Sequence, residues 1–124
     1  MSRNQLVLAA ALLAGSAVML GALGAHGLED EFVRAESQGW WATAVDYQMW
    51  HALALLALAA LTPRPGVVVP ALFVLGVLGF SGSLYALALG GSGALWGPVT
   101  PIGGTLLIVG WLALVVRAFR GGFA

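Results

Sequence analysis

The chain has 124 residues, of which 60% are hydrophobic and only 8% are charged. An ordinary soluble domain is about 45–50% apolar and about 25% charged. So few charges could not cover the surface of a soluble protein of this size, and the composition therefore predicts a single-domain, all-α integral membrane protein. The net charge of zero argues against a nucleic-acid partner. The absence of cysteine excludes disulfides, thiolate metal sites and thiol nucleophiles.

Four apolar stretches are long enough to cross a bilayer, which takes about 17–25 residues. We predict a bundle of four transmembrane helices at residues 6–25, 42–61, 67–89 and 102–119. The first stretch could alternatively be a signal peptide, because Arg3 precedes it. We favour a membrane span because the run is longer than the usual signal core of about 7–15 residues. Stripes of small residues in these spans predict close helix packing, either within one chain or between chains.

The connection after the first span carries most of the acidic residues. Residues 28–39 contain four of them, and Leu28, Phe32 and Ala35 share one helical face. This pattern predicts a short amphipathic helix at the membrane surface, in the first outer loop. The tryptophan pair at 40–41 is typical of an interfacial anchor. Residues 90–101 contain several glycines and prolines and are predicted to form a loop.

The arginines indicate how the spans are oriented. Four spans place both termini on one side of the membrane, and Arg3, Arg64, Arg117 and Arg120 gather on that side without an acidic residue. Arg34 lies on the other side with the acidic cluster. Because cytoplasmic loops carry an excess of arginine and lysine, both termini are predicted to be cytoplasmic.

This orientation places the polar side chains of the spans in one layer of the outer leaflet. At about 100° per residue, Thr43, Tyr47 and His51 share one face of the second helix, which we expect to point into the bundle. Asp46 lies on another flank near the interface, where it can stay hydrated or pair with Arg34. The layer predicts a polar pocket that opens to the outside and is lined by His26, Thr43, Tyr47, Gln48, His51, Ser81, Ser83, Tyr85, Thr100 and Thr105.

Four motifs, in order along the chain, resemble a known family. GAHGL, TAVxYQMxHALALL, FSGSLYxLxL and GPxTPIGGxxxxxGW are similar to the YgdD-type small membrane proteins, known as domain of unknown function 423 or UPF0382. The resemblance covers nearly the whole chain. It implies a four-helix protein of the bacterial inner membrane and no assigned activity, and it implies that position 46 is variable. The family pattern falls on His26, Gly27, Thr43, Tyr47, Gln48, Met49, His51, Ser81, Gly82, Ser83, Tyr85, Thr100, Pro101, Gly103 and Gly104.

The polar layer admits several functions. It can be a hydrogen-bonded network that only ties the helices together, since buried polar groups are normally satisfied in this way. It can form a pocket for a small molecule or a lipid headgroup, or belong to an accessory subunit of a homo-oligomer or a larger membrane complex. The alternative is a redox or metal-binding enzyme subunit that uses quinone, haem, zinc or copper, with His26, His51 and Asp46 as candidate ligands.

No hydrolase, kinase, nucleotide-binding or zinc-protease motif occurs in the sequence. No cofactor is required by the residues, and the bilayer is the one environment that they demand. We therefore favour a non-enzymatic binding or accessory protein.

Overall fold

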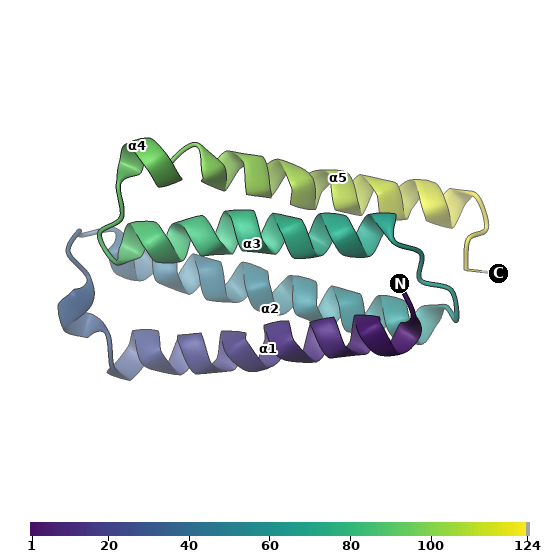
Figure 1. Cartoon of the computed structure of the whole chain (residues 1–124), viewed down its shortest axis with the longest axis horizontal. Coiled ribbons are helices and arrows are strands. Elements are labelled where there is room, and N and C mark those ends of the chain that lie inside the picture. Colours follow the sequence, from purple (N-terminus) through teal and green to yellow (C-terminus); the bar gives the residue numbers. More distant parts are fainter. Residues whose placement is uncertain (124) are drawn as a thin grey trace.

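The computed structural model describes residues 1–123 as an all-helical protein (Figure 1). Its elements are α1 (Arg3–His26), the 3-10 helix η1 (Glu29–Glu31), α2 (Ser37–Leu61), α3 (Val68–Ala88), α4 (Gly93–Trp96) and α5 (Val99–Phe119). Among the described residues there is no strand. Four helical stretches, the last of which runs through α4 and α5, are long and apolar enough to cross a membrane. The prediction of an all-helical protein with four such helices is confirmed.

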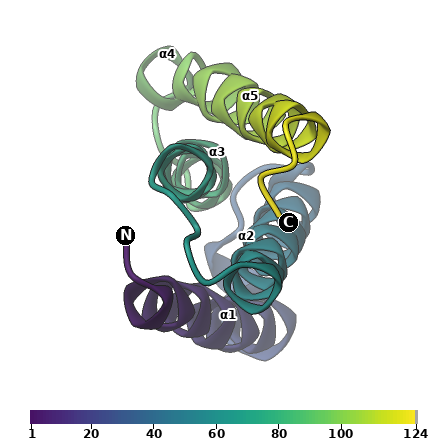
Figure 2. The same ribbon diagram turned by 90° about the vertical axis from the view of Figure 1, so that its right-hand side faces the viewer.

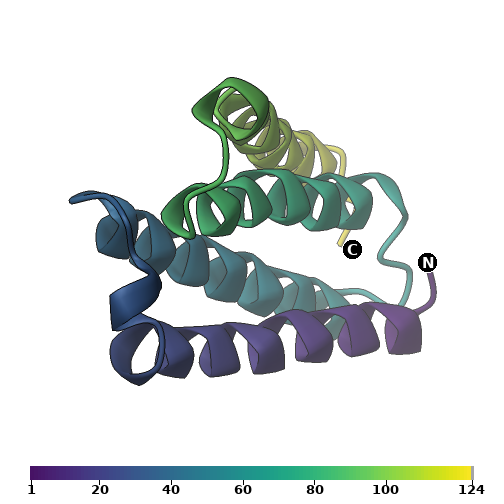
Figure 3. The same ribbon diagram turned by 60° about the vertical axis from the view of Figure 1, so that its left-hand side comes forward.

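The long helices pack as a series of neighbours. α1 packs on α2, α2 on α3, and α3 on α5. Figures 2 and 3 show the same order, with α1 and α5 on opposite sides of the central pair. Both termini lie at one end of the molecule, where the turn between α2 and α3 also lies (Figure 1). Because α1 and α5 each have one long neighbour, α2 and α3 supply most of the buried side chains.

Glycines set the closest helix contact, which is between α3 and α5. An added Cβ at Gly103 would meet the backbone of Gly79 at 2.6 Å and that of Phe80 at 2.8 Å. On the next turns, a Cβ at Gly76 would lie 2.8 Å from Cγ of Leu107. Small residues let helix backbones approach in this way inside membranes. The small-residue stripes of α3 and α5 therefore serve contacts within one chain.

Three helices begin earlier than the sequence indicated, and the first of them, α1, starts at Arg3 rather than at residue 6. α2 starts at Ser37 rather than at residue 42, so the tryptophan pair belongs to its first turns. The Ser37 hydroxyl accepts a hydrogen bond from the Arg34 backbone N–H at 3.2 Å, which organises this start. Of the amphipathic helix expected at 28–39, the structure has only η1 and the first turn of α2. α5 likewise starts at Val99, because Pro101 in a first turn needs no hydrogen-bond acceptor.

An arginine stabilises the chain at each end of the molecule. The Arg34 guanidinium donates to the carbonyl of Leu87, in the last turn of α3, at 2.8 Å and to that of Gly91, beyond the helix, at 3.1 Å. At the other end, Arg117 donates to Pro65 O, to Arg64 O at 2.7 Å, to the Thr62 hydroxyl and to Gly122 O. Orphan carbonyls near helix ends are favourable partners for a cation. Arg117 thus joins the turn between α2 and α3 to the end of α5.

Candidate functional site

Gln48 is the centre of a hydrogen-bond network that connects three helices. Its side chain is 5% exposed. The amide nitrogen donates to the Ser16 hydroxyl at 2.7 Å and to the Leu13 carbonyl at 2.9 Å on α1. The amide oxygen accepts from the Tyr85 hydroxyl of α3 at 2.9 Å. Gln48 therefore uses both donors and one acceptor to hold α1 and α3 against α2.

Two serines continue the network toward α5. The Ser81 hydroxyl donates to the Ala44 carbonyl of α2 at 2.7 Å. The Ser83 and Thr100 hydroxyls lie 2.6 Å apart and join α3 to α5. Within residues 1–123, every buried side-chain nitrogen and oxygen has a hydrogen-bond partner. The buried groups of the polar layer are accordingly satisfied by the protein itself, as buried groups in hydrocarbon must be.

His51 has both ring nitrogens engaged, and its partners fix the tautomer. Nδ1 lies 2.7 Å from the Tyr47 carbonyl oxygen, which can only accept, so Nδ1 carries the proton. Nε2 lies 3.0 Å from Nε1 of Trp111, an indole nitrogen that can only donate, so Nε2 accepts. Because its one lone pair is used, His51 could bind a metal or haem iron only by breaking the bond to Trp111.

Four of the ten predicted pocket residues do not join this network, and one of them is Tyr47, whose hydroxyl has no hydrogen-bond partner within residues 1–123. His26 is exposed at the end of α1, Thr43 is exposed on α2, and the Thr105 hydroxyl donates to Pro101 O of its own helix at 2.8 Å. The face of α2 that points into the bundle was predicted to centre on Thr43, Tyr47 and His51, and this prediction is wrong. Its buried residues centre about 120° around the helix from Thr43, near Gln48. Packing on two helices, α1 and α3, decides this direction, and a single-helix projection does not contain it.

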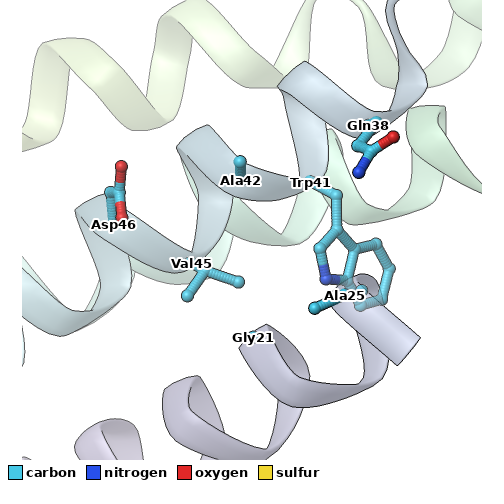
Figure 4. A pocket seen from close by; sticks show the side chains of 8 residues that line it. Gly21, Ala25, Gln38, Trp41, Ala42, Val45 and Asp46 are labelled. Carbon is cyan, nitrogen blue, oxygen red and sulfur yellow. The ribbon is translucent and has the colours of Figure 1, made fainter. Parts of the chain in front are cut away.

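Asp46 lies opposite the buried face of α2 and is exposed. It is at one end of a shallow groove of about 220 Å³ between α1 and α2, with Trp41 toward the other end (Figure 4). Gly24 makes room for the Trp41 indole, whose N–H donates to Leu20 O at 2.8 Å. The guanidinium of Arg34, the predicted partner of Asp46, donates instead to carbonyls at the C-terminal end of α3. Among the described residues, no three His, Asp or Glu side chains are grouped to hold a metal ion.

A larger groove lies between α2 and α5, beside the polar layer. It has a volume of about 440 Å³, within the range of about 300–1,000 Å³ that is usual for ligand pockets. α2 and α5 diverge here, and the Trp111–His51 hydrogen bond bridges them. The lining residues are mainly aromatic or aliphatic: Tyr47, Trp50, His51, Phe80, Gly104, Leu107, Ile108 and Trp111.

The residues that sequence reasoning missed are Ser16 and Trp111. Ser16 is the one side chain of the first span that carries a hydroxyl, and this isolation was a usable signal for a partner in another span. Trp111 lies well inside the fourth span rather than at an interface, where tryptophan is usual. An indole N–H inside hydrocarbon needs an acceptor, so its position also contained a signal.

Comparison with known proteins agrees with this architecture. Residues 20–104 match the model of a family described as protein of unknown function, DUF423. The chain belongs to this family. It is similar to a UPF0382 membrane protein of Staphylococcus saprophyticus, with 44% identity over 117 residues, which are 92% of this chain and 96% of the relative. A UPF0382 membrane protein of Haemophilus influenzae is 38% identical over 122 residues, covering 95% and 96%.

The name of one family member also specifies the membrane in which that protein resides. The UPF0382 inner membrane protein YgdD of Escherichia coli is 41% identical over 107 residues, which are 83% of this chain and 80% of the relative. The relatives are thus membrane proteins, and the four apolar helices of this chain fit a lipid environment. No solved structure matches the chain.

Proposed function

We propose that this DUF423 protein binds a small apolar molecule or a lipid within the membrane and catalyses no reaction. The groove between α2 and α5 carries the proposal, because it is an aromatic-lined space of ligand size that adjoins the polar layer. It contains two residues of the predicted pocket, Tyr47 and His51. Five others support the groove by joining α2, α3 and α5: Gln48, Ser81, Ser83, Tyr85 and Thr100.

The proposed role for the polar layer is therefore positional. Ser81 and Gln48 fix α3 on α2, and Ser83 fixes α5 on α3 through Thr100. The groove between α2 and α5 depends on both joints, since its two walls do not pack closely on each other. Site geometry set by hydrogen-bonded supports is typical of binding sites on rigid elements.

Orientation is part of the same proposal. Arg3, Arg64, Arg117 and Arg120 belong to the end of the molecule that holds both termini, which supports a cytoplasmic location for that end. The acidic residues of the first loop then lie outside, at the surface of a bacterial inner membrane. The groove begins in the outer half of the bilayer and is reached sideways from the lipid.

Two other functions fit less of the geometry. An accessory role in an oligomer or a larger complex agrees with the exposed apolar side chains of α1 and α5, but these also suit lipid. A metal or haem enzyme subunit would use His51, whose two ring nitrogens already have partners. A groove ligand needs no existing bond to be broken.

The test is to identify small molecules that co-purify with the full-length protein in a mild detergent, by extraction and mass spectrometry. Ile108 and Ile102 are both 62% exposed on α5, but only Ile108 lines the groove. We expect a ligand at a stoichiometric amount in the wild type and in Ile102→Trp, and its loss in Ile108→Trp. Equal amounts of the same molecules in both variants would contradict a groove site.

A further inference from the structure

Two chemically different parts of the space between α2 and α5 follow one another along these helices, with Trp111 between them. The first part is the aromatic chamber of about 440 Å³ that contains Tyr47 and His51. The second has about 350 Å³ and is lined by aliphatic and aromatic side chains without a charged or hydroxyl group. Trp111 is their common wall; it bonds His51 and is 46% exposed, so a ligand that fills both parts would pass over the exposed side of Trp111. Along α2 they extend from Tyr47 to Leu61, about 21 Å at about 1.5 Å per residue.

Tyr47 supplies a hydrogen-bond donor to the first part. Its hydroxyl has no hydrogen-bond partner within residues 1–123 and is not buried, whereas the other tyrosine, Tyr85, donates to Gln48. The nitrogens of His51 and Trp111 are bonded to each other and to the backbone. A hydroxyl facing hydrocarbon without a partner is costly. The chamber thus offers a donor to a molecule that brings an acceptor oxygen.

The walls of the chamber suit a flat ring. The Tyr47 ring lies 4.5 Å from Phe80 and 5.1 Å from Trp50, and the His51 ring lies 5.9 Å from Trp111, all measured between centroids. Aromatic rings at these separations attract a further ring by stacking or edge contact. The second part, in contrast, is long and apolar and suits a hydrocarbon tail.

From these observations we propose that the groove binds a lipid quinone. Its ring would occupy the chamber with one carbonyl oxygen accepting from the Tyr47 hydroxyl, and its tail would lie along the second part, toward Leu61. This inference rests on the proposed function and specifies the ligand of the same groove. It describes binding alone, with no electron transfer to the protein.

Depth and charge favour a quinone over a phospholipid. Tyr47 lies about 9 Å deeper than Trp41 along α2, below the level of the interface. A phospholipid bound at Tyr47 would have to bring its phosphate below that level or leave the hydroxyl unmatched. No charged side chain lines either part of the groove to receive a phosphate. A quinone carries its acceptor oxygen on a neutral ring and meets neither difficulty.

The experiment uses the full chain in nanodiscs and measures binding of a benzoquinone with a ten-carbon tail, by the amount retained at equilibrium. Decylbenzene, which has the same tail and no carbonyl, is the comparison. In the wild type we expect saturable binding of the quinone and weaker binding of decylbenzene. Tyr47→Phe should weaken quinone binding about threefold to tenfold, the size of one hydrogen bond, and leave decylbenzene unchanged. Thr43→Val, which removes an exposed hydroxyl of α2 outside the groove, is the control and should leave the affinity for quinone unchanged.

Ile108→Trp separates failure of this inference from failure of the proposed function. If both compounds bind equally, Tyr47→Phe has no effect and Ile108→Trp abolishes both, the groove is a site for apolar molecules and the quinone assignment is wrong. If retention is the same in Ile108→Trp as in the wild type, the compounds dissolve in bulk lipid and both proposals fail. If phosphatidylglycerol added as vesicles displaces the quinone at equal concentration, the ligand is a phospholipid.

Discussion

The two outer helices, α1 and α5, are attached to the central pair in different ways. α1 receives hydrogen bonds from side chains of α2, since Trp41 and Gln48 donate to its backbone and to Ser16. Before its last turns, where Arg117 bonds the turn between α2 and α3, α5 is held chiefly by backbone contact at Gly103, with one side-chain bond to α3 and one to α2. Hydrogen bonds from polar side chains connect helices whose backbones are separated by a side chain, whereas glycine allows the backbones of two helices to come into contact. α5 should therefore respond to changes in volume and α1 to changes in polarity.

The largest effect is expected from Gly103→Ala, which should loosen α5. The added Cβ meets backbone atoms of Gly79 and Phe80, which cannot rotate away. We expect the free energy of unfolding to fall by about 3 kcal/mol, the upper end for overpacking. Thermal unfolding in detergent, followed by tryptophan fluorescence, measures it. Gly82→Ala is the control, because its Cβ would meet nothing within 4 Å. Equal unfolding temperatures for the two variants would show that α5 is not held by this contact.

Gln48→Leu should cause the second-largest loss of stability, because it weakens the attachment of α1 and α3 to α2. The change removes hydrogen bonds to Ser16, Leu13 and Tyr85. Such contacts average about 0.6 kcal/mol each in membranes, so we expect a loss of about 2 kcal/mol. The same unfolding assay measures it, with Gln38→Leu, an exposed glutamine of α2, as the matched control. A loss no larger than that of the control would mean that α1 is attached by packing alone.

Arg117→Gln should have a smaller effect, confined to the end of the molecule that holds both termini. The variant loses the guanidinium that donates to Arg64 O and Gly122 O. Bonds from a charged donor contribute about 1.5–3 kcal/mol when buried, and partial exposure reduces this to about 1 kcal/mol. Proteolytic cleavage of the segment that follows residue 117 should be faster in Arg117→Gln than in Arg120→Gln, which changes the neighbouring arginine. Unchanged cleavage would contradict the role of Arg117 in fixing the end of α5.

Trp111→Phe should destabilise the protein least of the four substitutions, by about 0.6 kcal/mol, because one interhelical hydrogen bond is lost and a ring remains. The His51 ring should then gain freedom, which NMR of its ring protons in detergent micelles detects. Val115→Phe places a similar ring on an exposed part of α5 and should leave His51 unaffected. A His51 signal identical in wild type and Trp111→Phe would show that the hydrogen bond does not hold the ring.

The sequence by itself determined the membrane class, the four long helices and the family. These follow from composition, span length and motif order, which are local properties of the chain. It also identified Gln48, Ser83 and Tyr85 as polar residues of the spans, because hydrocarbon makes every such side chain conspicuous. Their pairing was not determined, since a hydrogen bond depends on the rotation of both helices.

Only the tertiary structure decided which faces meet. It turned Thr43 outward and Gln48 inward, because α2 packs on α1 and α3 at once. It paired His51 with Trp111, a residue 60 positions away, and so left α2 and α5 apart with a groove between them. In a membrane every face of an apolar helix is compatible with the solvent. Hydropathy therefore cannot show which face is buried, and close packing and hydrogen bonding make that choice.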